Sequence, residues 1–99
     1  MPDPFLIFWT IAIVLMIVSN VGFVRDNTTV AVLATTSAAF STAFAAAVLV
    51  FATIVIFVAA IFAVFAIFAA IEDSKKSYIA TSAIFYALMI VGAGMTYWQ

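Results

Sequence analysis

The chain has 99 residues, of which 70% are hydrophobic and only 7% are charged, and its net charge is −1. Soluble proteins carry roughly 25% charged residues and a small soluble fold leaves much of its surface in water, so this surface must face lipid or apolar surfaces of other chains. Cysteine and histidine are absent, which excludes disulfides, thiolate metal sites and histidine-based catalysis. The composition predicts an all-α, membrane-type protein with a single domain over residues 1–99, made of about three helices.

The first apolar segment, residues 4–24, has about the 20 residues that a helix needs to cross a bilayer. Pro4 suits the opening turn of a helix, where its missing N–H costs nothing. The preceding residues are acidic where a secretory signal carries Lys or Arg, so we expect a retained membrane helix. Trp9, near one end, is typical of the aromatic belt at a membrane interface.

The second apolar segment, Val30–Ile71, contains no charge, glycine or proline. Because a turn normally needs Gly, Pro, Asn or Asp, we predict one continuous helix over residues 29–71. At 1.5 Å per residue it would reach about 63 Å, twice the thickness of a bilayer core. The alternative is two short spans joined by a hinge near residues 37–42.

An alanine recurs at every seventh position along this segment. Seven residues are two helical turns, so the methyl groups form a nearly straight seam, and small residues on such a seam let helices approach closely in a membrane. We predict that the seam packs against either another helix of the chain or a second copy. Its residues are Ala31, Ala38, Ala45, Ala52, Ala59 and Ala66, and further small pairs with i, i+4 spacing are Ala59/Ala63, Ala66/Ala70 and Ala83/Ala87.

The third apolar segment is predicted to form a helix over residues 76–98, with Tyr97 and Trp98 as interfacial aromatics. Lys75 and Lys76 outnumber Arg25, so the loop before this helix is the better cytoplasmic candidate. This assignment places the N-terminus in the cytoplasm and both the Arg25 loop and the C-terminus outside. The outer loop then carries a glycosylation sequon that begins at Asn27.

The sequence offers no chemistry within the expected spans. Apart from Lys76 at the very start of the third span, they contain no Asp, Glu, Lys, Arg or His, and so no paired carboxylates, catalytic triad or ligand cluster; we therefore expect no catalytic, cofactor-binding or metal site and no enzyme. Three basic residues are also too few for nucleic-acid binding.

The main functional hypothesis is therefore a structural subunit that packs or self-assembles through small-residue helix interfaces. It would belong to a membrane complex or to the envelope or shell of a virion, with a lipid bilayer or neighbouring chains as partners. One alternative is an accessory subunit of a membrane enzyme. Another is a small channel or viroporin lined by the in-phase threonines Thr28, Thr35 and Thr42.

Overall fold

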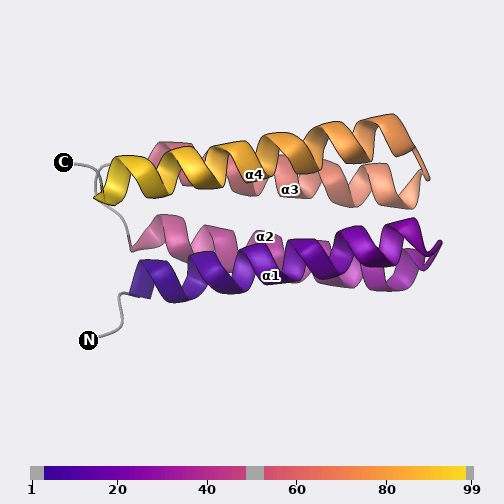
Figure 1. Ribbon diagram of the computed structural model, residues 1–99, viewed down its shortest axis with the longest axis horizontal. Coiled ribbons are helices and arrows are strands. Elements are labelled where there is room, and N and C mark those ends of the chain that lie inside the picture. Colours follow the sequence, from indigo (N-terminus) through magenta and orange to yellow (C-terminus); the bar gives the residue numbers. More distant parts are fainter. Residues whose placement is uncertain (1–3, 49–52, 98–99) are drawn as a thin grey trace.

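The computed structural model describes residues 4–48 and 53–97, which form four helices that run alternately up and down (Figure 1). Each has 19 to 23 residues, or about 28–35 Å at 1.5 Å per residue, close to the thickness of a bilayer core. All four are long and apolar enough to cross a membrane. The helices are α1 (Pro4–Val24), α2 (Thr28–Ala47), α3 (Thr53–Ile71) and α4 (Lys75–Tyr97).

Consecutive helices are neighbours in the bundle, and α4 returns beside α1. The turns at residues 25–27 and 72–74 lie at one end, which we call the charged end (Figure 1). The two turns and the first residues of α4 hold Arg25, Asp26, Glu72, Asp73, Lys75 and Lys76. The start of α1 and the end of α4 lie at the opposite end.

The two turns at the charged end are built in the same way. Asp26 and Asp73 follow their helices in a left-handed conformation, with φ of 57° and 55°. The next residue, Asn27 or Ser74, donates its backbone N–H to a carbonyl five residues back, at 2.8 and 3.0 Å. This is the Schellman pattern, which satisfies the last carbonyls of a helix. The chain therefore consists of two similar hairpins, with the second 47 positions after the first (73 − 26).

The two hairpins share the register of their buried faces but differ in side-chain size. Positions 31, 35, 38, 42 and 45 of α2 are buried, as are positions 78, 82, 85, 89 and 92 of α4, each 47 residues later. At these positions α2 has small residues and α4 has large ones. Because large side chains keep helices apart, α1 and α4 approach each other less closely than the other neighbouring helices. The contrasting pairs are Ala31 and Tyr78, Ala38 and Phe85, and Thr42 and Met89.

Small side chains fill much of the interior, and large ones cover the outside. Twelve of the eighteen buried hydrophobic residues of the described chain are alanines. Large apolar side chains are instead exposed on all four helices, as Val24 (80%) and Ile54 (77%) illustrate. Water would penalise such a surface, whereas tight packing of small residues is how helices associate in lipid. The distribution agrees with a membrane protein.

The expected continuous helix over residues 29–71 is wrong, because α2 ends at Ala47 and α3 begins at Thr53. The alternative hinge near residues 37–42 is also misplaced, since those residues lie within α2. Splitting the segment gives two helices of bilayer length whose alanine faces bury each other. This packing outweighs the absence of Gly, Pro, Asn or Asp, because tertiary contacts routinely override local preference.

The expected placement of the loops on opposite sides is wrong as well. Two antiparallel helices, α2 and α3, separate the Arg25 turn from the Lys75 turn, so both turns lie at the same end of the bundle (Figure 1). The start of α1 and the end of α4 likewise share one end. The expectation of opposite sides depended on one helix between the two turns, whereas the structure has two.

Candidate functional site

The alanine seam lies inside the bundle. Five of its six residues have no exposed surface, and Ala52 falls outside the described residues. Ala31 shares a buried cluster with Ala66, while Ala38 and Ala45 share another with Ala59. The described half of the seam on α2 therefore meets the half on α3 within one chain.

The other small-residue pairs divide between the core and the outer surface. Ala59, Ala63, Ala66 and Ala70 are buried, whereas Ala83 and Ala87 are exposed on α4. The exposed pair is therefore the one that remains available to a neighbouring chain.

The exposed pair belongs to a longer strip of small residues, the α4 stripe, formed by Ala80, Ala83, Ala87 and Gly94. All four are exposed, and at 3.6 residues per turn they lie within an arc of about 60°. A Cβ added to Gly94 would have no heavy atom within 4 Å. The α4 stripe is thus a shallow, open surface on the side of α4 that faces away from the core.

The equivalent face of α2 carries large side chains. Leu33 and Phe40, which lie 47 positions before Ala80 and Ala87, are 63% and 65% exposed. Leu33 and Ala80 are each the sixth residue of their helices, and both helices begin at the charged end. The two projecting side chains therefore lie at the same depth as the two alanines.

A buried polar network links α1, α2 and α4 near the charged end. The Asn20 amide nitrogen donates to the Tyr78 hydroxyl at 2.9 Å, and the Tyr86 hydroxyl donates to the Asn20 carbonyl at 2.6 Å. The Ser19 hydroxyl is hydrogen-bonded to Tyr78 at 2.5 Å and also to Thr35. Every buried side-chain nitrogen or oxygen of the described residues has a partner. The buried polar groups of the network are thus satisfied within the bundle, and their hydrogen bonds hold α1 against α4.

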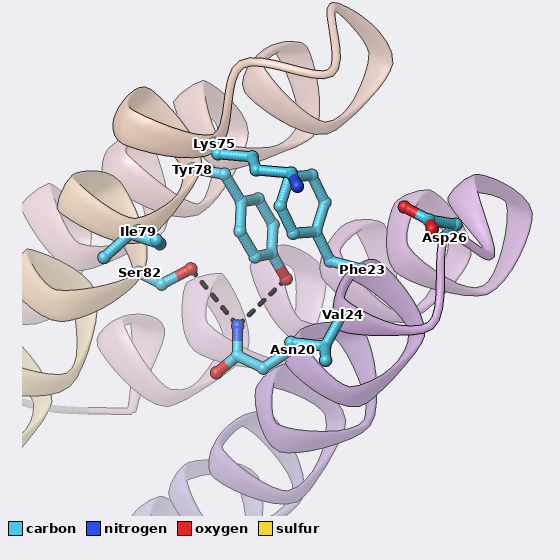
Figure 2. A pocket seen from close by; sticks show the side chains of 8 residues that line it. All are labelled: Asn20, Phe23, Val24, Asp26, Lys75, Tyr78, Ile79 and Ser82. Carbon is cyan, nitrogen blue, oxygen red and sulfur yellow. Dashed lines mark hydrogen bonds between the residues drawn. The ribbon is translucent and has the colours of Figure 1, made fainter.

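The network borders an open groove of about 330 Å³ between α1 and α4 (Figure 2). Phe23 and Tyr78 stack across it, with ring centroids 4.0 Å apart. The Asn20 amide nitrogen points towards Tyr78 and towards the Ser82 hydroxyl, which is 3.3 Å away (Figure 2). The groove is lined by Asn20, Phe23, Val24, Asp26, Lys75, Tyr78, Ile79 and Ser82.

The predicted interfacial aromatics have different environments. The half-buried Trp9 donates its indole N–H to the Met89 carbonyl at 2.9 Å, so it joins α1 to α4. Tyr97 is 53% exposed, and its ring lies 6.0 Å from that of Phe5. Trp98 falls outside the described residues.

Asn27, the candidate glycosylation site, caps α2. Its side-chain oxygen accepts the backbone N–H of Val30 at 3.2 Å. Asn is among the preferred residues at this position because it satisfies a free N–H of the first turn. The structure thus gives Asn27 a local structural role.

Two of the three threonines considered as a pore lining, and the neighbouring Thr36, bond within their own helix. Thr35, Thr36 and Thr42 each donate to the carbonyl four residues earlier, at 2.6 to 2.7 Å. Thr35 and Thr42 are also buried in the bundle, whereas Thr28 is exposed at the start of α2. The hydroxyl protons of Thr35, Thr36 and Thr42 are therefore already used in hydrogen bonds within α2.

The sequence analysis did not predict the polar network, although the sequence shows the spacing of its α4 residues. Tyr78, Ser82 and Tyr86 are spaced by four residues, which places them on one face of α4. Their partners Ser19 and Asn20 lie about 60 residues earlier, and their pairing depends on the return of α4 to α1.

Within residues 4–48 and 53–97, no group of three or more His, Cys, Asp or Glu could hold a metal ion. Comparison with protein-family models, with curated proteins and with solved structures finds no match.

Proposed function

We propose that the protein is a non-catalytic structural subunit that assembles with further copies of itself in the plane of a membrane or viral envelope. In this proposal the α4 stripe of one copy receives the outer face of α2 of the next. The function is to build a membrane-embedded assembly, and the chain supplies packing surfaces at its two outer faces.

The observation that carries the proposal is the size contrast between the two outer faces. Leu33 and Phe40 project from α2, while Ala80 and Ala87 leave space on α4 at the same depth. Small residues that let a neighbour approach closely are the usual basis of helix association in lipid. Large side chains that fill this space gain dispersion contacts.

The proposed contact joins two different surfaces, so it is heterologous. Its repetition gives a ring if the rotation closes and an open row if it does not. All copies have the same orientation in the membrane, since α2 and α4 both begin at the charged end. Such an array fits a coat or scaffold built from one small chain.

The charges support one orientation of this array. Arg25, Lys75 and Lys76 are the only basic residues of the chain, and all three lie at the charged end. Because Lys and Arg are enriched in cytoplasmic loops, we propose that the charged end faces the cytoplasm. Asn27 would then lie on the cytoplasmic side, which argues against its glycosylation.

The experiment is the native mass of gently extracted protein, with identification of every chain in the particle. The double variant Ala83→Leu with Ala87→Leu should break the assembly into smaller units, because overpacking a close contact costs about 1–3 kcal/mol per site. The matched control is Thr10→Leu with Val14→Leu. These residues are also exposed and four positions apart, but lie on α1.

Three results would contradict the proposal. One is a single-copy particle from the unaltered chain, and another is a double Ala→Leu variant that assembles as well as its control. The third is a particle in which the chain has larger, cofactor-bearing partners in fixed ratio, which would favour the accessory-subunit alternative.

A further inference from the structure

The groove between α1 and α4 combines polar and apolar walls at a particular depth. Asn20, Tyr78 and Ser82 line its inner part, while Val24 and Ile79 form exposed apolar walls. It opens at the charged end (Figure 2), where the ends of the helices meet the headgroup layer of a bilayer. A molecule in the groove would therefore need a polar head at this end and an apolar tail along the bundle.

The mouth of the groove carries one charge of each sign. Lys75 reaches into the mouth from the first turn of α4, and Asp26 belongs to the turn after α1; both are among the side chains that line the groove (Figure 2). Both side chains are exposed and line the groove. Because α4 begins at Lys75, the positive end of its helix dipole adds to the positive charge there.

We propose that this groove binds one phospholipid of the surrounding bilayer whose headgroup contains both a phosphate and a primary ammonium group, as in phosphatidylethanolamine. The phosphate lies at Lys75 and the start of α4, where a cation and the backbone N–H groups of a helix's first turn favour an anion. The ammonium group lies at Asp26. A purely anionic lipid would place negative charge near the Asp26 carboxylate, so the pair of charges selects a zwitterionic headgroup.

Ser82 supplies a further contact deeper in the groove. Within residues 4–48 and 53–97 its hydroxyl donates to the Met16 sulfur, at 4.0 Å, and a thioether is a weak acceptor. An ester carbonyl of the lipid offers a stronger acceptor to the same proton. The volume of about 330 Å³ lies at the lower end of small-molecule sites, so the groove holds the headgroup and ester region while the acyl chains extend along α1 and α4.

The test is native mass spectrometry of the full chain, released from vesicles of phosphatidylethanolamine, phosphatidylglycerol or phosphatidylcholine. We expect one phosphatidylethanolamine to be retained per copy, in preference to the other two lipids. Lys75→Gln should lower this retention at least about fivefold, since hydrogen bonds between charged groups are the strong ones. Asp26→Asn should remove the preference for phosphatidylethanolamine over phosphatidylglycerol.

Each variant has a control of equal charge change. Lys76→Gln and Asp73→Asn alter neighbouring charges of the same sign outside the groove lining, and both should retain the lipid as the unaltered chain does. The proposal is overturned if Lys76→Gln lowers retention as much as Lys75→Gln, if Lys75→Gln has no effect, or if the three lipids are retained equally. None of these results bears on assembly through the α4 stripe, because the native mass reports copy number separately.

Discussion

Gly92 on α4 is predicted to be intolerant of even one added methyl group. It is buried, and a Cβ at this position would lie 2.2 Å from Ile56 Cδ1 and 2.9 Å from Ile56 Cγ1 on α3. Ordinary carbon contacts are about 3.5–4.0 Å. Ile56 has no exposed surface, so its side chain has little room to move. Gly92→Ala should therefore separate α3 from α4.

Gly94 provides the matched control two residues away. A Cβ there meets nothing within 4 Å, so Gly94→Ala should gain only the helix propensity of alanine, about 1 kcal/mol. Gly92→Ala has the same gain but also an overpacking cost of about 1–3 kcal/mol. The free energy of unfolding of Gly92→Ala should thus be lower than that of Gly94→Ala by about 1–3 kcal/mol.

The assay is reversible unfolding in detergent, followed by far-UV circular dichroism. A second substitution, Ile56→Val, removes the carbon that Gly92→Ala would meet first. Alone it should cost about 0.5–1.5 kcal/mol, but in the Gly92→Ala background it should cost less or restore stability, because the two sites are in contact. Equal stability of Gly92→Ala and Gly94→Ala would refute the close packing of α3 against α4.

Two further predictions concern the network and the topology. Tyr78→Phe removes the hydroxyl shared by Asn20 and Ser19, so the same unfolding assay should show a loss of about 0.6–1.7 kcal/mol; Thr36→Val, whose hydroxyl bonds only its own helix, should change stability less. In the cysteine-free chain, single cysteines at Asp26 and Ser74 should react with a membrane-impermeant thiol reagent from one side and a cysteine at Val48 from the other. Labelling of the Asp26 and Ser74 variants from opposite sides would restore the three-helix topology.

The sequence was sufficient for the all-helical class and for the apolar character of the spans, because both depend on composition and segment length. The helix break between Ala47 and Thr53 was not predictable from local residue types, since residues 30–71 contain no Gly, Pro, Asn or Asp. The division into two helices is stabilised by the burial of the alanine face of α2 against that of α3. This contact exists only after the chain has folded back.

The alanine repeat illustrates the same difficulty. Its seven-residue phase runs unbroken through residues 31–66 and so shows no sign of a division in the sequence. The structure divides it between two helices whose buried faces share that phase. The difference in side-chain size between Phe40 and Ala87 on the outer faces could not be predicted from the sequence either. Their common depth depends on the 47-residue offset between the two hairpins, which only the structure shows.

Disulfide trapping in the membrane can detect assembly of copies through the outer faces of α2 and α4. Thr36→Cys and Ile84→Cys introduce thiols about one turn before Phe40 and Ala87, and leave both of those residues intact. We expect a covalent dimer when the two variants are mixed, none from either alone, and a ladder of oligomers from one chain with both cysteines. A dimer from Ile84→Cys alone, or no mixed dimer, would contradict this assembly.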